Sequence, residues 1–175
     1  MNDRAAVAAQ LGREPRSVID VAVRCPLGLP VVIKVPPHLD DGTPFPTTFW
    51  LTCPLAIRRI GRLEASGGVK RADARVQSDR VFAARHWAAA ERYRMERSAM
   101  IADDAPRHRP SGGVGGSRGG VKCLHAHYAD HAAGNDNPVG EDTARNVEPL
   151  NCSAPCVFQD DRAVVRNPAW VEPRP

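Results

Sequence analysis

The residues best suited to chemistry lie between positions 121 and 131, where one cysteine and three histidines occur close together. Residues four apart share one face of an α-helix, so Cys123, His127 and His131 would form one stripe. Thiolate and imidazole are both zinc ligands, and a tetrahedral site draws further ligands from elsewhere in the chain. His125 lies on another face of a regular helix. It joins the same site only if Cys123 and His125 lie in an irregular turn before the helix begins.

The other four cysteines supply candidate ligands from distant segments. Cys25 and Cys53 are each followed by proline, and we expect both on tight turns that expose a sulfur. Cys152 and Cys156 form a pair spaced as CxxxC. Five cysteines without an export signal argue against a disulfide framework and for free thiols or thiolate ligands. Cysteine is also commonly a small buried hydrophobic residue, so a role in the core is the alternative for each of them.

A thiol enzyme is a second hypothesis. Pro54 favours the first position of a helix, which makes Cys53 the N-cap of that helix. Backbone N–H groups at a helix N-terminus lower the pKa of a thiol, and a nearby histidine lowers it further. Cys53 beside His125 or His127 would therefore resemble a nucleophile with its base.

The segments that must position these residues follow from hydrophobic periodicity. Apolar residues alternate over 17–24 and recur over 30–35, which predicts an antiparallel hairpin with Cys25 at its bend. The run 49–51 is the densest apolar spot and is expected to anchor the core.

Four helices are predicted from apolar stripes and their start and stop signals. They are expected over 3–11, from Pro54 to the glycine pair at 67–68, over about 79–102, and over 121–133. The glycine-rich stretch 103–120 is expected to be a linker.

Length and composition limit the chain to one modest domain. Its 175 residues leave no room for a second large core. Only nine residues are aromatic, and Gly and Pro make up 30 of the 175 residues, above the usual share of about 12%. We therefore expect a thin core and long loops. No window reaches the roughly 18 apolar residues of a membrane helix, and no signal peptide is visible, so a cytoplasmic protein without a membrane partner is expected.

The net charge of +4 is unevenly distributed. Residues 54–100 hold eleven basic and five acidic side chains. The arginine-rich helices expected there could contact phosphates, so a nucleic-acid-binding or protein-binding module is a third hypothesis. Interleaved acidic residues such as Glu64 and Glu91 favour a solvated surface instead.

These elements predict an α+β fold in which a small β-hairpin or short antiparallel sheet packs against three to four helices, with many loops. We expect an N-terminal helix or extension over 1–12, a single α+β domain over 13–146 and a mobile C-terminal tail over 147–175.

Four segments carry long and unusual motifs, namely 24–30, 42–54, 111–116, and 121–127 followed by 137–140. In order and spacing, from about residue 12 to residue 142, they resemble an uncharacterised bacterial family. It is domain of unknown function family 501, sometimes labelled a septum formation initiator family. The resemblance implies no activity, but it places Cys25, Cys53, Cys123 and His125 inside the motif segments of the family. At 129–131 the chain departs from the family pattern, which favours His125 over His131 as a ligand.

The leading hypothesis is a Cys/His metal site at which the hairpin bend, a helix start and the C-terminal helix converge. The expected metal is zinc, bound by Cys25, Cys53, Cys123 and His125, with His127 as a further candidate ligand. A closed site of this kind would be structural, and its binding free energy would stabilise a thin core. A three-ligand version would hold a water and permit hydrolysis. An iron–sulfur cluster with Cys156 as a fourth thiolate is the alternative cofactor.

Overall fold

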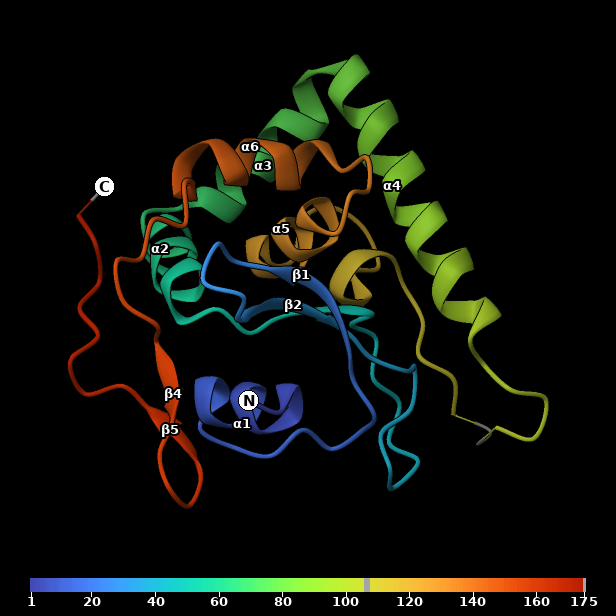
Figure 1. Ribbon diagram of the computed structural model, residues 1–175. Coiled ribbons are helices and arrows are strands. Elements are labelled where there is room, and N and C mark those ends of the chain that lie inside the picture. Colours follow the sequence, from blue (N-terminus) through green and yellow to red (C-terminus); the bar gives the residue numbers. More distant parts are fainter. Residues whose placement is uncertain (106–107, 175) are drawn as a thin grey trace.

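The computed structural model describes residues 1–105 and 108–174 (Figure 1). Its α-helices are α1 (Asp3–Leu11), α2 (Pro54–Ala65), α3 (Gly68–Ser78), α4 (Arg80–Ala99), α5 (Leu124–Ala132) and α6 (Pro138–Val147), and η1 (Val114–Gly116) is a short 3-10 helix. Its strands are β1 (Asp20–Arg24), β2 (Pro30–Lys34), β3 (Phe49–Leu51), β4 (Val157–Gln159) and β5 (Val164–Arg166). The α+β class predicted from the sequence is confirmed.

The central sheet is antiparallel, with the strand order β1-β2-β3, and confirms the predicted hairpin. In β2 the first four residues are buried because both faces of the strand are covered. Ile33 packs with Val7 of α1 on one face, whereas Val32 belongs to the main core with Leu51 of β3 and Leu124 of α5 on the other. Figure 1 shows α1 and α5 on opposite sides of this sheet.

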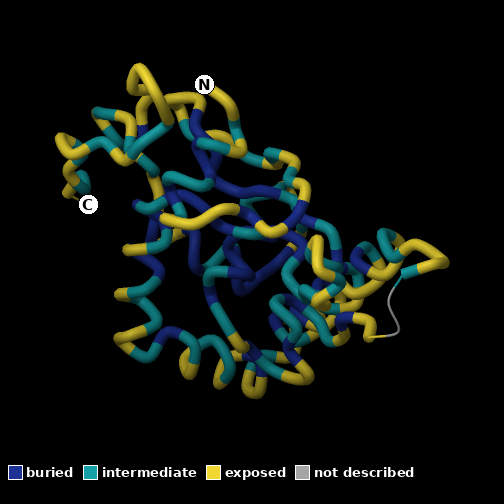
Figure 2. The backbone as a smooth tube through the Cα atoms, turned by 90° about the horizontal axis from the view of Figure 1, so that it is seen from below, coloured by how far each residue is buried: buried dark blue, intermediate teal, exposed yellow. Residues whose placement is uncertain are grey.

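Helix α5 forms the centre of the molecule. Six of its nine residues are buried, and buried residues gather around the middle of the fold in Figure 2. Helix α6 crosses α5 at Gly140, where an added Cβ atom would lie 2.2 Å from the carbonyl oxygen of His127 and 2.5 Å from Cβ of His131. Only a residue without a side chain permits this approach.

Helix boundaries are set by capping groups. The side chain of Asn2 accepts hydrogen bonds from the backbone of Arg4 and Ala5 at the start of α1, and Asp79 does the same for Val81 and Phe82 at the start of α4. Pro54 is the first residue of α2, as predicted, with Cys53 as its N-cap.

Two helices, α3 and α6, were not predicted, so the described residues hold six α-helices rather than three to four. The glycine pair at 67–68 ends α2, but it also starts α3, because Gly67 adopts a left-handed conformation (φ 88°) and the chain resumes a helix at once. Asn137 and Pro138, which follow the helix predicted over 121–133 and can signal the end of a helix, are the N-cap and first residue of α6.

The glycine-rich stretch 103–120 is held near its end by a buried arginine. The side chain of Arg97 is 1% exposed and donates hydrogen bonds to the carbonyl oxygens of Pro46 (3.1 Å) and Gly112 (2.6 Å). Val114 in η1 is also buried. This part of the predicted linker therefore packs against the domain.

The sequence predicts a mobile tail over 147–175. In the structure, the described residues of this segment include the hairpin β4–β5. This hairpin lies beside α1 (Figure 1), and Arg166 donates hydrogen bonds to the carbonyl oxygens of Ala9 and Gln10 at 3.0 Å. The mobility of the segment stays a prediction.

No helix within the described ranges is both long and apolar enough to cross a bilayer.

The crossing of α5 and α6 can be tested with two matched glycine substitutions. Gly140→Ala is expected to lower the free energy of unfolding by about 1–3 kcal/mol, because the methyl group overlaps the backbone of His127. Gly61→Ala, in α2, meets no atom within 4 Å and is expected to raise stability by up to about 1 kcal/mol. Chemical denaturation measures both values; equal effects of the two substitutions would contradict the close crossing.

Candidate functional site

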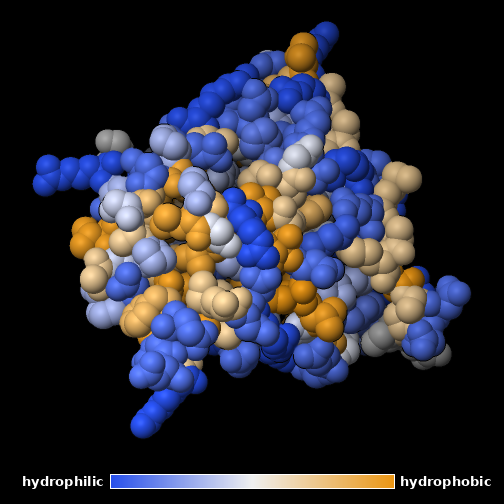
Figure 3. Space-filling view, in the orientation of Figure 1, coloured by the Kyte–Doolittle hydropathy of each residue, from blue (hydrophilic) through white to orange (hydrophobic). Residues whose placement is uncertain are grey.

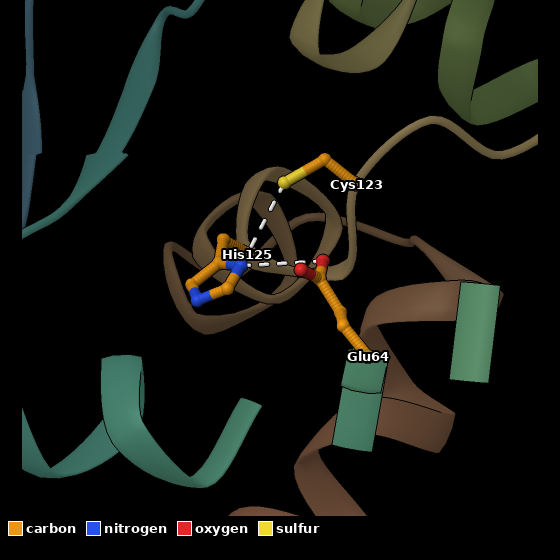
Figure 4. A group of neighbouring side chains, drawn as sticks. All are labelled: Glu64, Cys123 and His125. Carbon is orange, nitrogen blue, oxygen red and sulfur yellow. Dashed lines mark hydrogen bonds and ion pairs between the residues drawn. The ribbon is translucent and has the colours of Figure 1, made fainter. Parts of the chain in front are cut away.

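Three potential metal ligands meet where α2 ends and α5 begins. The Sγ atom of Cys123 lies 3.7 Å from Nδ1 of His125, and Oε1 of Glu64 lies 3.2 Å from the same nitrogen. Figure 4 shows the three side chains pointing toward one another, with both contacts meeting at one ring nitrogen. Among the residues that the structure describes, this is the only group of three or more such side chains whose ligand atoms lie within 4.8 Å of one another.

Local backbone structure brings the three side chains together. Cys123 is the N-cap of α5 and has an extended conformation (φ −157°, ψ 123°), so it stands outside the helix. The sequence allowed His125 to join Cys123 only if both preceded the helix; in the structure Cys123 alone does so, and this is sufficient. Glu64, in the last turn of α2, accepts a hydrogen bond of 2.6 Å from the backbone N–H of Leu124, the first residue of α5.

The orientation of the His125 ring is fixed by its other nitrogen. Nε2 lies 3.2 Å from the carbonyl oxygen of Ile57, which can only accept, so Nε2 carries a hydrogen. In the neutral ring the lone pair is then on Nδ1, which faces both Cys123 and Glu64. A nucleophile–base–acid triad would place the thiol and the carboxylate on opposite ring nitrogens. Here the sulfur of Cys123 and the carboxylate of Glu64 both face Nδ1. Together with the lone pair of Nδ1 they form a site for a cation, either a proton or a metal ion.

Electrostatics agree with a cation at this position. Burial disfavours the charged form of His125, but the hydrogen bond with Cys123 and the negative charge of Glu64 outweigh it and raise the pKa of His125 to about 9. Without a metal ion, His125 therefore holds a proton at neutral pH.

Cys123 and His125 form part of the wall of a cavity of about 380 Å³. Its other walls include the rings of Phe49 and Trp50, and Arg13, whose guanidinium group lies 4.9 Å from the centre of the Trp50 ring. The pair is therefore accessible to a small molecule.

Cys25 and Cys53 do not join this group. They line a separate small cavity together with Cys152 and Cys156. Burial raises the pKa of Cys53 to about 11, so its thiol is protonated at neutral pH. The hypothesis of a nucleophilic Cys53 requires a shift in the opposite direction, a lowered pKa.

His127 lies apart from the three ligands, deep between α5 and α6. Its Nδ1–H donates a hydrogen bond of 3.0 Å to Oδ1 of Asn137, and its ring lies 5.5 Å from that of His86. Burial lowers the pKa of His127 to about 4, so the ring is neutral. His131 lies at the crossing with α6. The stripe of Cys123, His127 and His131 therefore does not converge on one point.

Glu64 is the member of this group that the sequence did not identify as a candidate ligand. It lies 59 positions before Cys123, at the end of an arginine-rich helix, where an acidic residue is typical of a solvated surface. The local pattern carries no signal of its contact with α5. A contact of this kind depends on the packing of two helices.

The arginine-rich middle helices have most of their charge neutralised within the chain. Six arginines pair with carboxylates, namely Arg58, Arg62, Arg75, Arg85, Arg92 and Arg94. Arg59 and Arg97 are buried and donate to backbone carbonyl oxygens. The surface over α3 and α4 is mostly hydrophilic (Figure 3), and the ion pairs on these helices are typical of a solvated face rather than a phosphate-binding one.

Comparison with known proteins places the chain in a family without assigning an activity. No curated protein and no solved structure matches it. A family model described as a protein of unknown function (DUF501) matches residues 21–145, which include Cys25, Cys53, Glu64, Cys123 and His125. Because this match covers well over half of the sequence, the chain belongs to the DUF501 family.

Proposed function

We propose that the protein binds a divalent transition-metal ion, zinc, through Cys123, His125 and Glu64. One observation carries the proposal: the sulfur and the carboxylate both face the Nδ1 atom of an imidazole whose Nε2–H is held by the Ile57 carbonyl oxygen. A metal-binding histidine characteristically donates its other N–H to a carbonyl or carboxylate oxygen, which fixes the ring and its tautomer. Thiolate, imidazole and carboxylate together suit zinc.

The proposed site has three protein ligands and is open on one side. Cys25 and Cys53, expected from the sequence to close it, lie at the other cavity, whereas Cys123 and His125 border the cavity with Trp50. Three ligands and a free fourth position are typical of catalytic zinc, which supplies Lewis acidity and an activated water. We therefore favour a hydrolytic role over a closed structural one.

The cavity walls suggest the substrate class. Phe49 and Trp50 offer apolar surface, and Arg13 offers a positive charge at the same opening. A small molecule with an apolar body and an anionic group would complement these walls.

Zinc binding can be tested by titrating the metal-free full chain. Cys123→Ser, His125→Gln and Glu64→Gln are each expected to lower the affinity of one zinc equivalent by at least about 100-fold, more than is usual for the loss of an outer partner. His131→Gln, on the same helix but outside the group, is the control and should bind zinc as the wild type does. Equal zinc affinity and stoichiometry in all five proteins, each verified as folded, would exclude this site.

The pH dependence of stability tests the proton on His125. Its folded pKa of about 9 lies above the ordinary value of about 6.5, so the proton stabilises the metal-free fold fully below about pH 6.5, and this contribution is lost as the pH rises through about 9. The advantage of the wild type over His125→Gln in the free energy of unfolding should therefore fall by about 1–2 kcal/mol between about pH 6 and pH 9.5. Because zinc must displace this proton, zinc affinity should rise over the same range. A constant difference in stability would contradict the raised pKa.

The open fourth position can be tested with cobalt as a spectroscopic substitute for zinc. Azide added to the cobalt-loaded full chain is expected to shift the visible d–d bands, because an open position accepts an external anion. The shift should be absent in His125→Gln at the same cobalt concentration. An unchanged spectrum in the loaded wild type would instead indicate a closed, structural site.

A further inference from the structure

The four remaining cysteines converge on one small cavity from three separate parts of the chain. Cys25 follows β1 at the hairpin bend, Cys53 precedes α2, and Cys152 and Cys156 precede β4. All four are free thiols and all four line the same cavity. Cys123, the fifth, belongs to the site described above.

The C-terminal segment is fastened in the position that brings Cys152 to this cavity. Arg59 of α2 is 8% exposed and donates hydrogen bonds to the carbonyl oxygens of Val147 (2.7 Å) and Pro149 (2.8 Å) and to Oδ1 of Asn151 (3.1 Å). The same helix thus begins beside Cys53 and holds the chain immediately before Cys152.

Cys156 is fixed from the opposite side of the segment. Its carbonyl oxygen accepts a hydrogen bond of 3.0 Å from the backbone N–H of Asn167, beyond the β4–β5 hairpin. That hairpin is in turn bound to α1 through Arg166. Hydrogen bonds on both sides therefore fix the backbone that carries Cys152 and Cys156.

Several N–H groups are directed at the sulfurs. Nε2 of Gln10 lies 3.6 Å from Sγ of Cys156, and Nε1 of Trp170 lies 3.5 Å from Sγ of Cys152. The first N–H groups of α2 favour negative charge on Cys53. Donors of this kind are common around metal-bound thiolates, because the sulfur keeps part of its negative charge. Cys152 and Cys156 therefore have polar partners as well as the apolar neighbours of a core cysteine.

We propose that Cys25, Cys53, Cys152 and Cys156 form a four-thiolate site for a soft metal centre. Thiolates are the ligands that select zinc and iron–sulfur clusters. A bound cationic centre would neutralise the negative charge of all four thiolates.

The spacing of the sulfurs favours a cluster over a single ion. Zinc bonds of about 2.3 Å to four sulfurs require the sulfurs to lie only about 3.8 Å apart. Among the described residues no three of these four sulfurs lie within 4.8 Å of one another. We therefore assign the site to a four-iron iron–sulfur cluster, in which each iron takes one cysteine.

This proposal shares no residue with the zinc site and does not rest on it. Two of its four ligands, Cys152 and Cys156, lie outside residues 21–145, over which the family matches. The cluster would join the C-terminal segment to the hairpin bend and to α2. All four thiolates would be occupied by the cluster, so the centre would be closed to external ligands.

The test is anaerobic reconstitution of the full chain with sulfide and equal amounts of ferrous and ferric iron. The wild type is expected to hold about four irons and four acid-labile sulfides, with a broad visible charge-transfer absorption. Serine in place of any one of the four cysteines should reduce bound iron by more than about half, whereas Cys123→Ser, the matched control, should retain all of it. Loss of iron in Cys123→Ser to the same extent would overturn the assignment.

A second test uses only the wild-type chain, so it stays informative if the serine variants fail to fold. It maps which cysteines react with an alkylating reagent. The four cysteines are expected to resist alkylation until the cluster is dismantled by oxidation and chelation, and then to react together. One zinc per chain on these four cysteines, without iron or sulfide, would overturn the cluster. A folded chain that holds neither metal and reacts equally before and after the treatment would overturn the site. Neither result bears on zinc at Cys123 and His125, which is measured separately.

Discussion

The carboxylate of Glu64 is the group on which the arrangement around α5 depends. A buried helix needs acceptors for its first N–H groups, and its N-cap, Cys123, provides no side-chain hydrogen bond. Glu64 supplies one from another helix, through its contact with Leu124. The same oxygen atom faces His125. One carboxylate oxygen therefore both caps α5 and forms part of the candidate site. The packing of α2 against α5 sets the geometry of both contacts.

The opposite end of α5 is held by a second polar group. Asp130 is fully buried; its carboxylate accepts hydrogen bonds from Arg92 of α4, from Asn135 and from Asn137, the N-cap of α6. Burial raises the pKa of Asp130. A buried carboxylate is costly unless it is paired and hydrogen-bonded, and here it is both. With Glu64 at one end and Asp130 at the other, α5 is fixed along its length, which gives the side chains of its first turn a rigid support.

Local patterns in the sequence predicted what depends on near neighbours. Alternation predicted the hairpin, Pro54 the start of α2, and the apolar run at 49–51 an anchor of the core. They could not predict Glu64 as a partner of His125, since that contact joins residues about 60 positions apart. Nor could local patterns show that Cys123 lies at one site and the other four cysteines at another. That division depends on which cavity the folded chain brings each cysteine to. The helices α3 and α6 were missed because their start signals also serve as stop signals.

The C-terminal segment completes the wall of the cysteine cavity. Cys25 and Cys53 precede Cys152 and Cys156 by about 100 residues, so the cavity is complete only when the C-terminal segment packs against the rest of the domain. Arg59 holds this segment in place through hydrogen bonds to the carbonyl oxygens of Val147 and Pro149. Removal of the chain from residue 152 onward would take Cys152, Cys156 and Trp170 away from the walls of this cavity and leave Cys25 and Cys53 without these neighbours.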